Sequence, residues 1–351
     1  MNPILRKSIF TFRYKEPRMD SSKALSSKLA PVKYKCYATY GNILDLVNEN
    51  MDYGALTTLA KCYDIPLHCF TFLDFQIAPT FEEFERILNR PIKDHNPFPK
   101  IEEDFNMPKL AAVLGIDVNE LVSSWSPKGV DKGFTRKFLE GHAWKFAKEE
   151  KWKSCITILA LLIFGIILFP NIDNFIDRST IEVFLFGNPV PFLLVDFYHI
   201  FHTHHEKKGG TFLCCVPLLH MWMKTHMPQK GPFVSKDLPW SQKFASLSAG
   251  SIQWYKRESE TQDIIFRCGG FPNIPLIGTH GCINYNPVSC MRKFGHAMNG
   301  PPEDKDLVPF VINNIDPLNP IVRKVRKAWT KIVRSGSELG KKNVIAKEPY
   351  V

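Results

Sequence analysis

The chain of 351 residues contains an uninterrupted apolar run, Cys155–Phe169, that has no charged side chain. As an α-helix these 15 residues would extend about 22 Å, because each residue adds ~1.5 Å, whereas a bilayer's hydrocarbon core is roughly 30 Å thick. Pro170 ends the run, and Lys151 and Lys153 precede it. We therefore expect a helix buried in a large core. A membrane-associated segment is the alternative.

Composition and periodicity predict a mainly α fold. Hydrophobic residues make up 44% of the sequence and aromatic residues 13%, which is enough to bury a large core and argues against disorder over most of the chain. Apolar residues recur more often at helical than at strand spacing. We expect a single large helical domain over residues 34–302, with minor short strands.

The helix with the clearest boundaries is predicted within Ile77–Ile92. Thr80 can cap its start, and Glu83, three residues later, completes a capping box. Pro91 should end it, because proline cannot continue a helix. The apolar stripe of this helix consists of Phe81, Phe84, Ile87 and Leu88.

Further helices are predicted from apolar spacing, and Pro217 is expected to kink the last of them. They cover residues 40–50, 53–63, 110–114, 118–125, 134–151, 179–187, 191–205 and 209–227.

The positive charge of the chain is concentrated at its two ends. The formal net charge is +10, with +7 in Met1–Lys35 and +7 in Ile321–Val351, so the middle carries −4. We expect residues 1–33 to be a poorly ordered basic tail, and residues 303–351 to be a linker followed by a basic amphipathic helix over Ile321–Ser335. Basic ends are typical of proteins that bind nucleic acid or anionic surfaces, and they can also serve solubility alone.

Six basic residues of the expected C-terminal helix are the candidates for nucleic-acid contact: Arg323, Lys324, Arg326, Lys327, Lys331 and Arg334. Spacings of three and four residues would place Lys324, Lys327, Lys331 and Arg334 on one cationic stripe, which could neutralise several phosphates of DNA or RNA. Trp329 falls on the opposite, apolar side, where we expect it to pack. A solvated face and a helix that binds a protein partner are the alternatives.

Two groups of histidine and cysteine residues resemble metal ligands in type but not in spacing. Neither contains a CxxC or an HExxH arrangement, so we expect no metal and no other cofactor. The first group is His199, His202, His204, His205, Cys214, Cys215, His220 and His226. The second is Cys268, His280, Cys282 and Cys290.

Motifs for catalysis are missing from the sequence. It contains no G-x-S-x-G elbow, no G-x-x-x-x-G-K-[ST] loop and no G-x-G-x-x-G after a strand. Asp104, Asp196 and Glu206 could meet in space, but no pattern requires it. We expect a protein that is not an enzyme, and an unrecognised enzyme stays open as an alternative.

Cysteine usage favours a reducing compartment. The chain has 9 cysteines, an odd number, and neither an Asn-x-Ser/Thr sequon nor a long apolar segment at its N-terminus. We expect free, mostly buried thiols and a nuclear or cytoplasmic location.

The segment Arg267–Pro301 is rich in glycine and proline yet contains phenylalanine, isoleucine and cysteine, so we expect an ordered, packed connector. Its FPNIPLIGTHGCINYNP motif, the Thr80 helix, the apolar helix that ends at Phe169 and Pro170, and GGTFLCC…LLHMWM resemble a plant domain of unknown function. That domain is related to the aminotransferase-like plant mobile domain of transposon-derived and transposon-associated proteins. The resemblance covers about residues 34–302.

This resemblance implies a transposon-derived protein that acts through protein contacts and association with nucleic acid. The relatives include domesticated nuclear proteins and have no established catalytic residues, so none is carried over. The word aminotransferase implies no such activity here, because no lysine lies in a recognisable pyridoxal-phosphate setting. Relatives tend to have a longer C-terminal region, which leaves open a truncated or non-functional copy.

Overall fold

The computed structural model describes residues 11–17, 20–92, 97–98, 104–254, 264–271, 273–279, 281–287, 310–313 and 319–335. Within these ranges helices predominate, and the strands form small sheets of two or three strands each. The expected mainly α fold is confirmed in part, because helices predominate but the strands are more than a minor feature.

The helices lie mostly where apolar spacing predicts them, with shifted boundaries. They are α1 (Asp20–Lys28), α2 (Lys33–Tyr40), α3 (Ile43–Val47), α4 (Tyr53–Ala60), α5 (Phe81–Leu88), α6 (Met107–Leu114), α7 (Val118–Ser124), α8 (Arg136–Lys148), α9 (Trp152–Ile163), α10 (Arg178–Phe186), α11 (Val190–Glu206), α12 (Val216–His226), α13 (Trp240–Ala245) and α16 (Pro320–Trp329). Short 3₁₀ turns cover Ala30–Val32 and Pro232–Val234.

The strands pair mainly with neighbours that are close in sequence. They are β1 (Thr11–Tyr14), β2 (Tyr63–Asp64), β3 (Cys69–Thr71), β4 (Gln76–Ile77), β5 (Ser126–Lys128), β6 (Asp131–Thr135), β7 (Phe175–Asp177), β8 (Gly209–Phe212), β9 (Ile264–Cys268), β10 (Ile274–Ile277), β11 (Gly281–Tyr285), β12 (Ile312–Asn313) and β13 (Ile332–Ser335). Two pairings join distant segments, namely the parallel pair β1–β8 and the antiparallel pair β9–β13.

The apolar run lies in the core, as expected. Residues 155–163 belong to α9, and Phe164–Leu168 continues it as a π-helical segment. Every residue of Cys155–Phe169 is buried except Ile166, which is half-buried, because α1, α2, α6 and α8 pack around α9. In the described part of the chain, no helix has both the length and the apolar character needed to cross a membrane.

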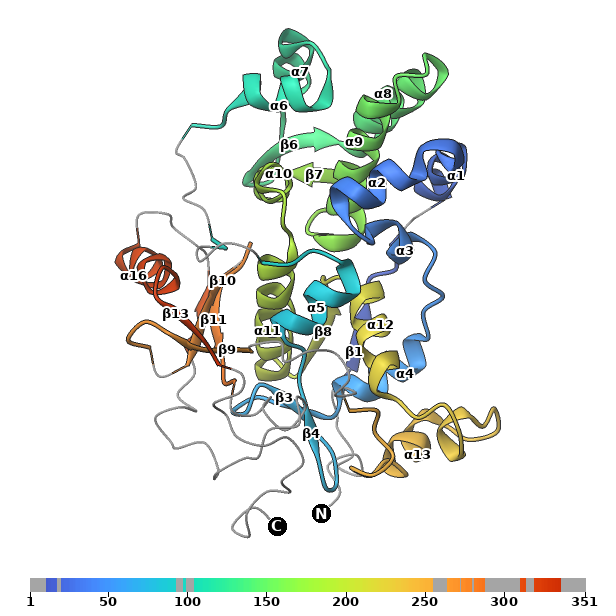
Figure 1. Cartoon of the computed structure of the whole chain (residues 1–351), viewed down its shortest axis with the longest axis vertical. Coiled ribbons are helices and arrows are strands. Elements are labelled where there is room, and N and C mark those ends of the chain that lie inside the picture. Colours follow the sequence, from blue (N-terminus) through green and yellow to red (C-terminus); the bar gives the residue numbers. More distant parts are fainter. Residues whose placement is uncertain are drawn as a thin grey trace.

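A second central helix, α11, packs against both α5 and the strands of the C-terminal sheet. It lies in the middle of Figure 1, with α5 on one side and the strands β10 and β11 on another. The Tyr198 hydroxyl donates a hydrogen bond to the Pro79 carbonyl (2.6 Å), and the Tyr198 ring stacks on Tyr285 at a centroid distance of 5.9 Å. One side chain of α11 thus contacts both the start of α5 and the C-terminal sheet.

The capping box at the start of α5 is confirmed. The Thr80 hydroxyl accepts a hydrogen bond from the Glu83 N–H (3.3 Å), and the Glu83 carboxylate accepts one from the Thr80 N–H (2.9 Å). The helix ends at Leu88, and Asn89 follows in the left-handed conformation with φ 50°. Pro91 therefore lies beyond a helix that has already ended.

The poorly ordered tail expected over residues 1–33 is wrong for residues 11–17 and 20–33. Residues 11–14 form β1, which pairs with β8, and residues 20–28 form α1. The physical reason is apolar burial, since Phe12, Leu25 and Leu29 are at most 4% exposed. Residues 1–10 lie outside the described residues.

The helix expected over residues 209–227 is two elements. Gly209 and Gly210 have φ values of 152° and 128°, which do not occur in a right-handed helix, and they start the strand β8. The helix α12 begins only at Val216, so Pro217 lies in its first turn. Proline is well tolerated there, because the first N–H groups have no partner within the helix, and no kink results.

The C-terminal third is built on strands. The segment expected to be a packed connector includes the end of β9 and all of β10 and β11, and its residues 288–301 lie outside the described residues. The helix α16, expected to belong to a separate segment over residues 303–351, packs on the same core, because Trp329 is fully buried and contacts Phe81 and Phe98.

The close approach of the π-helical segment to β7 gives a stability test. A Cβ atom at Gly165 would lie 2.4 Å from Ile176 Cγ1, so Gly165→Ala should lower the free energy of unfolding by about 2 kcal/mol through overpacking. Urea unfolding followed by circular dichroism measures this change.

The matched control is Gly141→Ala, since Gly141 lies within α8 and has no atom within 4 Å of the added methyl group. That variant should gain up to about 1 kcal/mol. Equal stability of the two variants would contradict the packing described for Gly165.

Candidate nucleic-acid interface

The helix α16 is fixed by a cap and an apolar face. The Asn319 side chain accepts a hydrogen bond from the Ile321 N–H (2.9 Å), and Pro320 follows in the first turn. Val322, Val325 and Trp329 are fully buried, and the Trp329 indole N–H donates to the Pro275 carbonyl (2.7 Å). As expected, Trp329 packs in the core.

The helix is shorter than predicted, because the expected extension to Ser335 is wrong. The helix α16 ends at Trp329, and Ile332–Ser335 forms β13 against β9, with an irregular register between Val333 and Arg334. β-Branched residues favour a strand when a partner strand is present, and Ile332 and Val333 pair with β9 here. A single cationic stripe from Lys324 to Arg334 therefore does not form.

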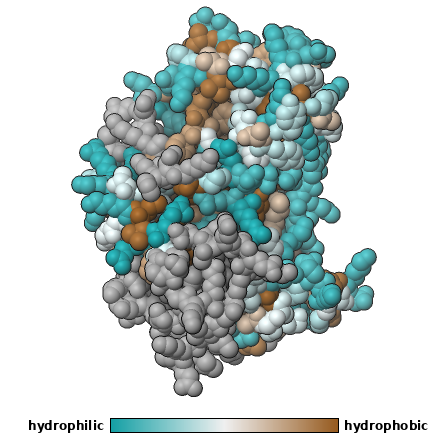
Figure 2. Space-filling view, in the orientation of Figure 1, coloured by the Kyte–Doolittle hydropathy of each residue, from teal (hydrophilic) through white to brown (hydrophobic). Residues whose placement is uncertain are grey.

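Four of the six candidates form an exposed surface, which we call the α16 basic face: Arg323, Lys324, Lys327 and Lys331. The first three lie on adjacent helical positions within an arc of about 100°, and Lys331 lies in the turn that follows. The sequence from 319 to 335 has no acidic residue, and the described part of the chain provides no ion-pair partner for these four cations. In Figure 2, hydrophilic side chains cover the left edge, where Figure 1 places α16.

Arg326 is separated from this face. It is half-buried beside Cys282 of β11, and its Nε atom is buried without a hydrogen-bond partner among the described residues. Burial lowers the pKa of Arg326, and the nearby Cys282 opposes that change. The guanidinium is thus partly removed from solvent and does not lie on the exposed face.

Arg334 is half-buried and contacts other parts of the fold. Its guanidinium donates a hydrogen bond to the Ile92 carbonyl (3.3 Å) and lies near the carboxylates of Glu82 and Glu85. Burial raises the pKa of both carboxyl groups, that of Glu85 to about 7, and the positive charge of Arg334 opposes this rise. Arg334 is therefore a counter-charge for buried carboxylates of α5.

These carboxylates connect α5 to the element that supports α16. The Glu82 carboxylate accepts a hydrogen bond from the Ile265 N–H of β9 (2.9 Å). Glu85 accepts one from the Ile92 N–H. Since β9 pairs with β13, the acidic residues of α5 hold the two-stranded sheet that follows the basic face.

Glu83 lies between Glu82 and Glu85 in α5 and makes the most buried polar contact of this helix. It is 0% exposed, and its Oε1 atom lies 2.6 Å from Nε2 of His226 in α12. The other ring nitrogen, Nδ1, lies 3.1 Å from the Gln253 carbonyl. Both neighbours, a carbonyl and a carboxylate oxygen, are hydrogen-bond acceptors.

The first histidine and cysteine group is dispersed over separate contacts. His202 Nδ1 lies 3.2 Å from Nε2 of His68, whose pKa burial lowers to about 4. His205 contacts the Phe201 and Ala60 carbonyls, at 2.7 and 2.8 Å. Among the residues that the structure describes, no three His, Cys, Asp or Glu side chains are arranged to hold a metal ion.

The second group is only partly described. Cys268 and Cys282 are buried free thiols, and burial raises the pKa of each to about 12. His280 and Cys290 lie outside the described residues. The other six described cysteines are also free and buried, which confirms the thiol state expected from the sequence for that part of the chain.

The three carboxylates considered for catalysis have different roles. Asp196 accepts hydrogen bonds from the Thr279 N–H (2.9 Å) and hydroxyl (2.6 Å), which fixes the turn between β10 and β11. Glu206 pairs with His202 at 3.3 Å. The two are ten positions apart on one helix, or about 15 Å along its axis, so they do not meet. Asp104 precedes α6.

The chain belongs to the family described as a domain of unknown function (DUF7745), which matches residues 22–351. The match extends from within α1 through α16 and β13, so it includes the α16 basic face and the buried carboxylates of α5. Neither a curated protein nor a solved structure matches the chain.

The raised pKa of Glu85 predicts a pH dependence of stability. An ordinary glutamate titrates near 4.5, so with a value of about 7 the folded state holds this proton more tightly than the unfolded state does. The free energy of unfolding should therefore fall as the pH rises from 4.5 to 7, by about 3 kcal/mol, and Glu82 adds to the fall.

The variant Glu85→Gln keeps an acceptor for the Ile92 N–H but cannot titrate. It should therefore remove most of the contribution of Glu85 to the fall in the free energy of unfolding, as measured by urea unfolding at several pH values. Glu149→Gln, at a fully exposed carboxylate, is the control and should leave the slope nearly unchanged. An unaltered pH slope in Glu85→Gln would show that Glu85 does not titrate as described.

Proposed function

We propose that this protein is an interaction module that performs no catalysis, and that its α16 basic face contacts the phosphate backbone of nucleic acid. The observation that carries the proposal is the set of four exposed cations on α16 and the turn that follows it, while the other side of the helix is anchored in the core by Trp329. No acidic side chain within residues 319–335 competes for them.

The contact is electrostatic and independent of base sequence. Lysine and arginine side chains that neutralise phosphates release condensed counterions, so affinity falls steeply with salt. The α16 basic face offers at most four such contacts, because Arg326 and Arg334 turn inward. Micromolar to sub-millimolar affinity follows, in the range of about 10⁻⁴ to 10⁻⁶ M that is typical of non-specific binding.

A firmly packed helix suits this role. The cap at Asn319 and the buried side of α16 fix the backbone before any ligand arrives, so only the side chains lose conformational freedom on binding. A protein partner that reads the same face through acidic groups is the second candidate. The same four cations would serve it.

We further propose that the family is related to the plant mobile domain of transposon-derived proteins and that the chain acts in the nucleus. Support comes from the Thr80 capping box, the buried helix that ends before Pro170, and the strands β10 and β11 of the FPNIPLIGTHGCINYNP segment. These are the segments on which the resemblance rests.

The test is binding of the full chain to a random-sequence DNA duplex, followed by fluorescence anisotropy over a salt series. With three to four phosphate contacts, the plot of log affinity against log salt should have a slope between about −2.7 and −3.6. Replacing Arg323, Lys324, Lys327 and Lys331 together by glutamine should abolish the binding, while circular dichroism confirms the fold.

A matched control removes the same charge elsewhere, by glutamine at the exposed residues Lys132, Lys137, Lys145 and Lys148 on and next to α8. This control should bind like the unaltered protein. A flat salt response, or an equal loss in the control, would rule out the α16 basic face as the binding surface.

A further inference from the structure

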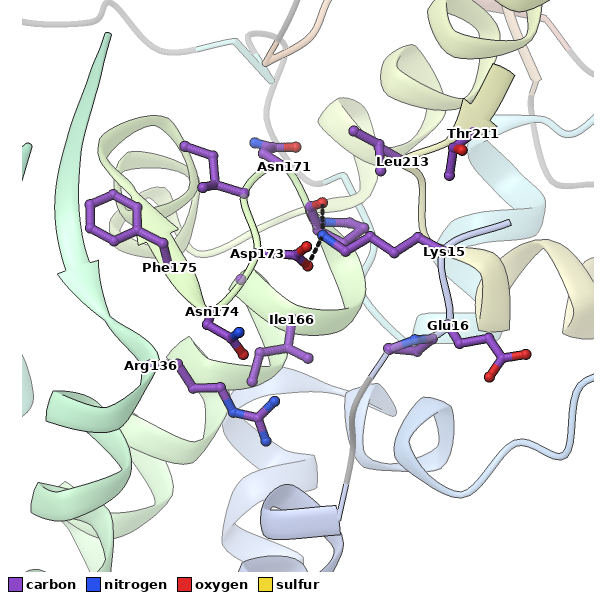
Figure 3. Close-up of a pocket in the computed structure, with 14 residues that line it drawn as sticks. Lys15, Glu16, Arg136, Ile166, Asn171, Asp173, Asn174, Phe175, Thr211 and Leu213 are labelled. Carbon is purple, nitrogen blue, oxygen red and sulfur yellow. Dashed lines mark hydrogen bonds and ion pairs between the residues drawn. The ribbon is translucent and has the colours of Figure 1, made fainter. Parts of the chain in front are cut away.

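A pocket of about 500 Å³ is lined by residues from four separate parts of the chain, none of them in α16. One wall is Lys15–Pro17, which follows β1. The opposite wall contains Arg136 and Asn174, and the π-helical segment contributes Gly165 and Ile166 (Figure 3). Its residues thus come from distant parts of the sequence, and the β1–β8 pairing brings the first of these segments into place.

The π-helical segment shapes the floor of the pocket. The Phe169 N–H donates to the Phe164 carbonyl, five residues earlier, at 2.8 Å, so the turn is wider than in an α-helix. Ile166, the one residue of the apolar run that is not fully buried, lines the pocket. Such insertions carry strain and often occur at functional sites.

Lys15 closes one side of the pocket and is not available to a ligand. Its ammonium group pairs with Asp173 Oδ1 (2.8 Å) and donates to the Pro170 carbonyl (3.1 Å). The Glu16 carboxylate extends away from Arg136 in Figure 3. Lys15 therefore does not compete with Arg136 for a bound anion, and the Glu16 carboxylate does not occupy the Arg136 guanidinium.

Arg136 offers donors to the pocket. Its side chain is only 13% exposed, its Nε atom donates to Glu140 (2.8 Å), and its backbone N–H donates to the Asn174 carbonyl (3.0 Å). In the described part of the chain, its two terminal nitrogens have no hydrogen-bond partner. A guanidinium edge of this kind matches the two oxygens of one carboxylate.

Charge and shape restrict the ligand class. The lining residues carry two positive charges, on Lys15 and Arg136, and two negative charges, on Glu16 and Asp173. Because Glu140 also pairs with Arg136, the site does not favour a phosphate dianion, whereas the terminal nitrogens of Arg136 can hold a single negative charge. The apolar lining side chains, which would contact an aliphatic ligand, are Pro17, Ile166, Pro170, Ile172, Phe175 and Leu213.

We propose that this pocket binds a small aliphatic monocarboxylate, whose two oxygens accept hydrogen bonds from the terminal nitrogens of Arg136. Its hydrocarbon part lies against Ile166 and Leu213. The site is independent of the α16 basic face, so either function can hold without the other.

The experiment is isothermal titration of the full chain with 4-methylpentanoate and with the neutral 4-methylpentanamide, which has the same hydrocarbon part. The acid should bind with a dissociation constant on the order of 1 mM, a value that suits a ligand of this size, and the amide at least about tenfold more weakly. Equal binding of acid and amide, stronger binding of inorganic phosphate, or no binding of the acid would each overturn the proposal.

Two variants and one control locate the site. Arg136→Lys keeps the charge but loses the forked donors, and Thr211→Phe fills the pocket from an exposed strand position. Each should weaken binding of the acid at least about tenfold. Arg178→Lys is the control. Arg178 forms an ion pair with Glu182, four positions later, as Arg136 does with Glu140, but it lies outside the pocket lining. Full binding by the folded Thr211→Phe protein, or an equal loss in the control, would place the ligand elsewhere.

Discussion

The contact between Glu83 and His226 joins the parts of this fold. Glu83 is fully buried, caps α5 through Thr80, and reaches α12 through the imidazole at 2.6 Å. A buried carboxylate left without its partner is strongly destabilising, so this contact fixes α5 relative to α12. The neighbouring carboxylates of α5 then hold β9 and its partner β13.

The α16 basic face is a consequence of this arrangement. The strand β13 takes Arg334 toward the carboxylates of α5, and the packing of Trp329 turns the other side of α16 to solvent. The six cations thus have different surroundings. Arg334 lies near the carboxylates of α5, Arg326 is half-buried beside Cys282, and the other four remain exposed for a polyanion. The pocket beside the π-helical segment depends on a different contact, the pairing of β1 with β8.

Local signals in the sequence predicted what local physics determines. The capping box at Thr80, the burial of Cys155–Phe169 and the position of Trp329 all follow from spacing and polarity. The pair of Glu83 and His226 spans 143 positions, and no pattern in one sequence reports such a distance. Similarly, the sequence of β13 is interpreted as the end of a helix because its partner β9 is remote in sequence. The pairing of these strands places Arg334 half-buried beside α5 and not on the expected stripe.

A double-mutant cycle on Glu83→Gln and His226→Asn tests the central claim most directly. Glutamine also serves in a capping box, so Glu83→Gln removes the charge and leaves the cap of α5 in place. If the contact joins α5 to α12, the two changes should be coupled by about 2 to 3 kcal/mol in the free energy of unfolding. Effects that add within about 0.5 kcal/mol would show that the two residues stabilise the fold independently.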